Sequence, residues 1–301
     1  MLSFQDRKKL NPMEKIYKSL SAKTLKKLHN EELEILQEII RICDKHSINY
    51  YLAGGTLLGA VRHGGFIPWD DDLDIGMLRE DYNKFIIYAI EEIDDKYFVH
   101  CEKTDPNYWL PFIKVRKNNT TFVEEFLNNR NVIHNGIFVD VFPMDNCNNL
   151  YVLNYLRAVI IKSINDFLLV SRKIVDIKDS RHPKLNKLLE LFDVNFLLLT
   201  RNKLLNIKAG KDTKKVACFV GGYHIKKEIM LRDDIVPFGK INFEKMECTC
   251  FSDCNKYLSS LYGDYMKLPA KENRINHGAH FIDFENGAKI VSKNVIKGDL
   301  E

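Results

Sequence analysis

The apolar positions of the chain fall into successive patterns. Residues 22–48 place them at helical spacing, and Ser21 or Thr24 is suited to cap the start of that helix. Short apolar segments follow, interrupted by a second helical pattern over 81–93. Strands are predicted over 49–53, 73–76, 97–101, 112–116, 120–124 and 136–142, and Pro143 is expected to end the last one. The first half of the chain is therefore predicted to be α+β, with a mixed β-sheet and flanking helices.

A helical pattern then covers 150–205. Leu153, Leu156 and Ile160 begin a series of apolar residues three or four positions apart, which predicts an amphipathic helix facing the core, and one or two further helices follow. Residues 216–251 return to short strands, and a last helix is predicted over 254–262, ended by Gly263. The predicted parts are a core unit with its N-terminal helix at 1–149, a helical insertion at 150–215, and a C-terminal α+β segment at 216–301 that packs on the core.

Composition narrows the class of protein. The 301 residues are 45% hydrophobic and 29% charged, an ordinary globular profile. The net charge of +4 comes from Lys and Arg spread over the whole chain, which argues against a nucleic-acid binder and suits anionic substrates. The first ten residues lack the apolar core of a signal peptide, and no uncharged apolar run reaches the roughly 18 residues of a membrane span. We therefore expect a cytoplasmic protein whose seven cysteines are reduced thiols.

Paired carboxylates are the first chemical signal. Asp72 and Asp74 are two residues apart on a predicted strand, so they project from the same face, while Leu73 and Ile75 point into the core. Two aligned carboxylates repel each other unless a cation lies between them. Hard oxygen ligands at this spacing predict a Mg²⁺ or Mn²⁺ site.

Asp140 is the third carboxylate of this set. It lies on a later predicted strand between Val139 and Val141, where a charged side chain needs a partner. If that strand is next to the strand of Asp74, three carboxylates share one metal site. Such a site readies an attacking oxygen and neutralises a leaving phosphate, and Asp140 is placed to accept the proton of an attacking hydroxyl.

Phosphate-binding candidates surround the carboxylates. Gly54, Gly55 and Thr56 open a helix directly after a strand, where free backbone N–H groups and the helix dipole favour phosphate. Lys114 with Arg116 on a strand, and Arg62 with His63 after the glycine helix, are further candidates for the phosphates of a nucleotide.

Several alternatives remain open. Asp70, Asp72 and Asp74 imitate the start of an EF-hand loop, but Ile75 occupies the position that requires glycine. Asp-x-Asp also occurs in sugar-nucleotide glycosyltransferases, which usually place a larger nucleotide-binding unit before it. Asp70 and Asp71 alone are equally well explained as a solvated acidic turn. Cysteines of the C-terminal segment offer an irregular zinc spacing, or else are ordinary core thiols; they are Cys248, Cys250 and Cys254, with Cys218 or His224 as the fourth ligand.

The segment 51–75, which reads YLAGGTLLGAVRHGGFIPWDDDLDI, resembles the LicD family of phosphocholine transferases within the nucleotidyltransferase-fold superfamily. The resemblance continues through Asp81, Tyr82 and Phe85, through 112–116 and 137–145, and through 262–266 with Leu268, Pro269, Arg274 and His277. It is loose over 150–215. It implies a nucleotidyltransferase-like core at 1–149, with the superfamily's glycine pair at Gly54 and Gly55 and its carboxylates at Asp72, Asp74 and Asp140.

The resemblance also implies an activity. Phosphocholine would pass from CDP-choline to a sugar hydroxyl of a cell-surface glycan or its lipid-linked precursor, with release of CMP. Trp69, beside Asp70 and Asp71, either packs in the core, the favoured interpretation, or helps hold a choline cation. Arg274 and His277 either reach the nucleotide or the acceptor, or only hydrogen-bond within the C-terminal segment. Apart from the resemblance, the helical insertion is expected to shape the acceptor site; its amphipathic helices either pack on the core, which is the favoured interpretation, or touch the inner face of the membrane. Relatives that move phosphoethanolamine, a phosphonate or ribitol phosphate, a nucleotidyltransferase that releases pyrophosphate, and a non-catalytic binder are the competing hypotheses.

Overall fold

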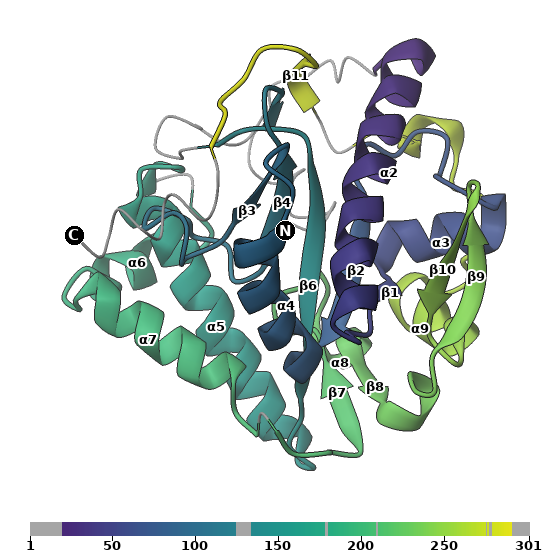
Figure 1. Cartoon of the computed structure of the whole chain (residues 1–301). Helices are drawn as coiled ribbons and strands as arrows, with labels where there is room; N and C mark the ends of the chain where they lie inside the picture. The colour runs from purple at the N-terminus through teal and green to yellow at the C-terminus, as the bar shows by residue number, and fades with distance from the viewer. Residues whose placement is uncertain are drawn as a thin grey trace.

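The protein is described by a computed structural model that covers residues 20–124, 134–177, 180–208, 210–274, 276 and 279–290. Figure 1 shows a central curled sheet against which α2 and α4 lie side by side. The helices α5, α6 and α7 form one flank of the molecule, and α3, α9 and the β9–β10 hairpin form the opposite flank. The predicted mixed sheet with flanking helices is therefore confirmed.

The elements of the first half follow the predicted order. They are α2 (Ala22–Lys45), β1 (Tyr51–Leu52), α3 (Gly54–His63), β2 (Asp74–Leu78), α4 (Arg79–Glu92), β3 (Tyr97–His100), β4 (Ile113–Lys117), β5 (Thr121–Glu124) and β6 (Phe138–Asn146). Ser21 caps α2, since its hydroxyl accepts a hydrogen bond of 3.0 Å from the amide of Thr24. The apolar face that the sequence predicts for α2 is buried, with Leu28, Ile35 and Leu36 wholly inaccessible to solvent.

The second half contains the helical insertion and a smaller α+β segment. Its elements are α5 (Tyr151–Ser171), α6 (Pro183–Leu189), α7 (Val194–Leu205), β7 (Lys215–Ala217), α8 (Ile225–Glu228), β8 (Ile229–Leu231), η3 (Arg232–Asp234), β9 (Gly239–Phe243), β10 (Met246–Cys250), α9 (Cys254–Tyr262), η4 (Lys271–Asn273) and β11 (Ala279–Asp283). The predicted helix over 254–262 is confirmed, and Gly263 ends it with a positive φ of 73°. None of the described helices is both long and apolar enough to cross a membrane.

Strand order places the two acidic strands side by side. The main path of the sheet is β1-β2-β6-β4-β3, and β7 with β8 extends it from the end of β6. Strands β2 and β6 are parallel neighbours, whereas the pairs β1–β2, β4–β6, β3–β4 and β6–β7 are antiparallel. The condition on which the predicted carboxylate site depends, adjacency of the strands that carry Asp74 and Asp140, is met.

Pro143 does not end its strand, and that prediction was wrong. The amide of Asp140 donates to the carbonyl of Leu73, so even-numbered residues of β6 bond toward β2 and odd-numbered residues bond the other way. On that other side, β4 pairs only as far as Val141 and β7 begins at Asp145. Pro143 therefore lies in the gap between two partners, where its missing N–H costs no ladder hydrogen bond.

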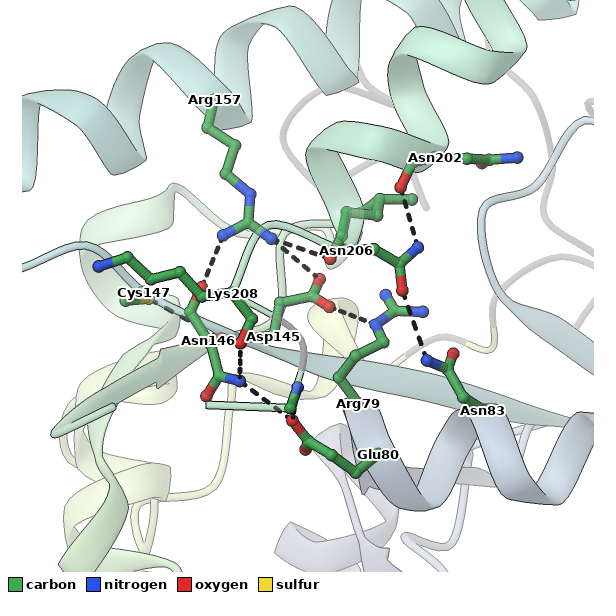
Figure 2. A network of polar contacts seen from close by, with 12 residues as sticks. Arg79, Glu80, Asn83, Asp145, Asn146, Cys147, Arg157, Asn202, Asn206 and Lys208 are labelled. Carbon is green, nitrogen blue, oxygen red and sulfur yellow. Dashed lines mark hydrogen bonds and ion pairs between the residues drawn. The ribbon is translucent and has the colours of Figure 1, made fainter. Parts of the chain in front are cut away.

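A buried charge network joins the sheet to the insertion (Figure 2). Arg79, the first residue of α4, donates from Nε to the carboxylate of Asp145 near the end of β6. Arg157 of α5 lies 3.8 Å from the same carboxylate, and its guanidinium also donates to the carbonyls of Asn146 (2.6 Å) and Leu205 (3.0 Å). These contacts fix α5 against the end of the sheet.

The first half of α5 faces the opposite way from the prediction. Leu153, Leu156 and Ile160 are exposed, whereas Asn154 and Arg157 are buried. Apolar residues of α5 face the core only farther along, from Ala158 onward. The helix itself was predicted correctly, but the polar network at Asp145 decides which side of its first turns faces inward.

Candidate active site

One row of polar side chains crosses the sheet. Asp74 lies opposite Asp140 on the parallel neighbour β6, Asp140 lies opposite Lys114 on β4, and Lys114 lies opposite His100 on β3. Residues that pair across neighbouring strands project from the same face. Two predicted carboxylates and one predicted phosphate ligand therefore meet on a single face, and His100 extends the row.

Lys114 and Asp140 form the centre of the row. The Lys114 ammonium lies 2.7 Å from one carboxylate oxygen of Asp140 and 3.1 Å from the other. It also lies 3.3 Å from the centre of the Phe138 ring, a cation–π contact on the same face of β6. Both charged side chains are buried. The Asp140 carboxylate, which the sequence predicts as the third metal ligand, is therefore paired with the Lys114 ammonium.

The acidic loop before β2 is buried rather than solvated. Asp70, Asp71 and Asp72 are each less than 8% exposed, which excludes the solvated turn for the first two. Asp72 precedes β2, which begins at Asp74, so the alternation of a strand does not by itself set the direction of its side chain. The amide of Ala279 donates to the Asp71 carboxylate over 3.3 Å, which brings the C-terminal segment onto the loop.

The glycine pair makes room for carboxylates. A Cβ on Gly54 would lie 3.1 Å from Oδ2 of Asp74, and a Cβ on Gly55 would lie 2.8 Å from Oδ2 of Asp70. Gly54 also has a positive φ of 52°, which favours glycine. Thr56 accepts a hydrogen bond of 2.8 Å from the amide of Asp74 and so holds the start of β2. The N-terminus of α3, predicted to bind phosphate, is thus packed closely against the site's own acids.

Two polar residues of α2, one buried and one half-buried, were missed from the sequence. Glu32 is 1% exposed, and its burial, followed by the negative charges of Asp72, Asp71, Asp70 and Asp74, raises the pKa of its carboxyl well above the ordinary value. His29 donates from Nε2 to the Asp70 carbonyl over 2.8 Å and stacks on Phe66. The available signal was a pair of polar residues three positions apart on the predicted core face of that helix.

Arg116 is held within the sheet. It donates from Nε to Nδ1 of His100 over 2.9 Å and from the guanidinium end to the carbonyl of Gly136 over 2.8 Å. His100 in turn donates from Nε2 to Asp105 over 2.9 Å, and burial lowers the pKa of His100 to about 4. The imidazole is therefore neutral at physiological pH and fixes the guanidinium. A phosphate-binding role for Arg116 stays a prediction.

A basic and aromatic group lies next to the acidic loop. Arg62 donates to the carbonyl of Tyr265 over 2.7 Å and to the ring of its neighbour His63 over 3.0 Å. The His63 ring meets the edge of Trp69, and the Arg274 guanidinium lies 5.3 Å from the Trp69 ring centre. Burial lowers the pKa of Arg62, and the positive charge of Arg274 adds to that effect. The structure therefore brings four predicted substrate-binding residues together, whereas His277 lies outside the described residues.

Two tyrosines of α9 complete the surroundings of Asp74. The Gly54 amide donates to the hydroxyl of Tyr257 over 3.1 Å, and a Cβ on Gly54 would lie 3.9 Å from the hydroxyl of Tyr262. Burial raises the pKa of both phenols, and the Asp74 charge adds to the shift. Both remain neutral donors at physiological pH. They were missed because nothing in the sequence pattern brings α9 next to β2.

The donor chemistry fits a hard divalent cation. The buried side chains around the row and its loop offer carboxylate oxygens, the ligands that such a cation prefers. Within the described ranges, however, no three His, Cys, Asp or Glu side chains are already arranged as a metal site. Cys248 and Cys250 pack in the hydrophobic core, as ordinary core cysteines do.

Comparison with known proteins assigns this arrangement to a class. Residues 47–157 match the family described as LicD/FKTN/FKRP, nucleotidyltransferase domain. That range begins before β1 and ends in α5, so it contains all four residues of the polar row. Residues 47–157 of this chain therefore form a nucleotidyltransferase domain of the LicD type.

Individual relatives differ in how much of the chain they cover. The lipopolysaccharide cholinephosphotransferase LicD of Haemophilus influenzae is 28% identical over 262 residues, which cover 81% of this chain and 92% of that protein. The human ribitol 5-phosphate transferase FKRP is 44% identical over 48 residues, 16% of this chain and 10% of the relative. Human ribitol-5-phosphate transferase FKTN is 34% identical over 59 residues, 20% of this chain and 13% of the relative. The nearly full-length similarity is therefore to a cholinephosphotransferase, and the similarity to the ribitol phosphate enzymes is local.

Proposed function

We propose that this protein transfers phosphocholine from CDP-choline to a sugar hydroxyl of a cell-surface glycan or its lipid-linked precursor, with release of CMP. The observation that carries the proposal is the register of the sheet, which sets Asp74, Asp140 and Lys114 side by side on one face. The length of the similarity to a cholinephosphotransferase supports choline over ribitol phosphate as the transferred group.

In this proposal Asp72, Asp74 and Asp140 hold Mg²⁺ or Mn²⁺. The ion supplies charge neutralisation for the diphosphate of the donor. Because Lys114 contacts the Asp140 carboxylate at 2.7 Å, cation and ammonium compete for that carboxylate. Displaced from Asp140, Lys114 stays on the same face and is placed to pair with a phosphate oxygen. Asp140 then accepts the proton of the sugar hydroxyl as the hydroxyl oxygen attacks the phosphorus of the phosphocholine group.

The basic and aromatic group is assigned to the donor. Arg62 and Arg274 bring positive charge next to the acidic loop, which suits the phosphates of the nucleotide. The guanidinium of Arg274 lies near the Trp69 ring, so a choline cation at that ring must compete with an arginine that is already there. A choline contact at Trp69 therefore requires that Arg274 move from the ring.

The test is incubation with Mg²⁺ and, separately, CDP-choline, CDP-ethanolamine or CDP-ribitol, with a glycan acceptor and CMP as the measured product. Release of CMP from CDP-choline supports the proposal. Release of CMP only from another donor keeps the reaction class but changes the identity of the transferred group. Pyrophosphate released from a nucleoside triphosphate would instead support a nucleotidyltransferase. Asp72→Asn is expected to abolish CMP release, whereas Asp44→Asn, an exposed acid of α2, is the matched control and retains it.

A further inference from the structure

The first turns of α5 expose their apolar residues and bury their polar residues, the reverse of a helix that packs on a core. Outward-facing positions are all apolar and each is more than 40% exposed; they are Tyr151, Val152, Leu153, Tyr155, Leu156, Val159 and Ile160. The inward-facing positions include Asn154 and Arg157, both buried. A helix on a water-exposed surface ordinarily shows the reverse pattern.

The inward polar residues explain why the helix cannot rotate. Asn154 exchanges two hydrogen bonds of 2.8 Å with the backbone of Asn148, and Arg157 reaches Asp145, as Figure 2 shows. The Arg157 guanidinium also lies 3.7 Å from the Phe219 ring centre. Turning the apolar side inward would carry Arg157 out to solvent, separate it from Asp145, and break its hydrogen bonds to the carbonyls of Asn146 and Leu205. The apolar face is therefore held outward by the fold itself.

This exposure is concentrated in the insertion. Within the described ranges, eighteen large apolar side chains are exposed, and thirteen of them lie between Leu150 and Leu199. Eight lie at the start of α5, its N-cap Leu150 included. The other five lie at the end of α6, in the connection that follows it and in α7: Leu188, Leu191, Phe192, Phe196 and Leu199. Exposed apolar surface of this extent on one part of a protein marks an interaction surface.

A lysine-rich segment borders the start of α5. Residues 203–215 contain five lysines and one acid, Asp212; the lysines are Lys203, Lys208, Lys211, Lys214 and Lys215. Four of the five are exposed, and Lys208 is half-buried. Two hydrogen bonds hold this segment next to the start of α5. The Leu205 carbonyl accepts one from Arg157 of α5, and the Lys215 carbonyl accepts one from the amide of Cys147, which precedes α5. Apolar side chains next to lysines are the chemistry of a helix that lies on an anionic bilayer.

From this juxtaposition we infer that the first turns of α5 and the lysine segment 203–215 form a docking surface for an anionic lipid bilayer. The helix lies in the plane of the interface, with Leu153, Leu156 and Ile160 among the acyl chains and the lysines at the headgroups. A second copy of the chain fits less well, because an isologous contact brings the same lysines of both copies to its rim. The chain passes from the end of β6, the strand that carries Asp140, to α5, so docking of α5 sets the orientation of that strand relative to the membrane.

The test is flotation of the full chain with vesicles of phosphatidylcholine alone and of phosphatidylcholine mixed with phosphatidylglycerol. We expect binding to the mixed vesicles, and at least about tenfold weaker partitioning for Leu153→Ser with Leu156→Ser. Lys211→Gln with Lys214→Gln is expected to weaken binding to the anionic vesicles by about tenfold. The matched control is Ile87→Ser with Phe281→Ser, two exposed apolar residues outside the insertion, which bind as wild type does.

Binding is measured without any substrate, so its outcome is separate from that of the proposed reaction; Asp140→Asn is expected to float as wild type does. The inference is overturned if the wild-type chain binds neither vesicle or if the Leu153/Leu156 variant binds unchanged. It is also overturned if sedimentation shows a stable dimer that the Leu153/Leu156 variant converts to a monomer.

Discussion

Asp74 and Asp140 lie directly opposite each other on parallel neighbouring strands. Two carboxylates in this position repel each other, and the structure moderates the repulsion with the ammonium of Lys114 on the far side of Asp140. The same arrangement that makes the acids tolerable also makes them available to a cation.

Asp140→Asn is expected to lower the rate of CMP release by at least about a hundredfold, because it removes both a cation ligand and the proton acceptor. It also leaves the Lys114 ammonium buried without its carboxylate partner, which costs about 3 kcal/mol of stability. Urea unfolding and steady-state kinetics measure the two effects separately. A folded Asp140→Asn variant with near-wild-type kcat/KM contradicts the assignment of Asp140.

Lys114→Gln tests the competition between ammonium and cation. Removing the ammonium is expected to lower stability in EDTA by about 3 kcal/mol, and Mg²⁺ is expected to restore more of this loss than it adds to wild type. Thermal unfolding with EDTA and with Mg²⁺ measures the difference. Lys117→Gln, on the same strand but paired with Glu31 and Glu34, is the control and shows no added Mg²⁺ effect. Equal Mg²⁺ responses in all three proteins would remove Asp140 from the cation site.

The sequence alone predicts the acids but not everything that surrounds them. Asp140 is identifiable because Val139 and Val141 mark its strand as buried, and a charged residue there needs a partner. Glu32 and His29 belong to a helix some forty residues earlier, and only the packing of α2 brings them to the acidic loop. Their identification requires tertiary structure, since helical spacing by itself classes them with the core face.

The sequence pattern also does not determine which face of a helix is buried. The spacing of Leu153, Leu156 and Ile160 predicts a helix correctly, yet the assumption that apolar residues face the core is wrong for its first turns. Asn154 and Arg157 face inward because buried backbone carbonyls and Asp145 satisfy them. Which of two faces is buried depends on such partners, and those are contributed by β6, by Asn148 after it and by α7.

Glu228 gives stability a predictable dependence on pH. Burial raises the pKa of this carboxyl from 4.5 to about 7. The folded protein therefore keeps a proton that the unfolded chain releases, and stability falls as the pH rises from about 4.5 through 7. Glu228→Gln mimics the protonated form and is expected to be the more stable protein above pH 7, by up to about 3 kcal/mol, and equal to wild type near pH 4. Urea unfolding across this range measures the difference, with the exposed Glu247→Gln as control. A difference that does not grow with pH rules out this account.

Gly54→Ala tests whether the glycine pair serves the site or only the backbone. Gly54 and Gly64 both have positive φ, 52° and 72°, so alanine strains the backbone at each by about 1 kcal/mol. A Cβ at Gly64 meets nothing within 4 Å, whereas a Cβ at Gly54 lies 3.1 Å from the Asp74 carboxylate. We therefore expect similar losses of stability in the two variants, but a fall in kcat of about tenfold or more only for Gly54→Ala, because it displaces a cation ligand. Thermal unfolding and CMP release, measured on the same preparations, distinguish the two effects. Equal kcat values for both variants would mean that Gly54 serves the turn into α3 and not the position of Asp74.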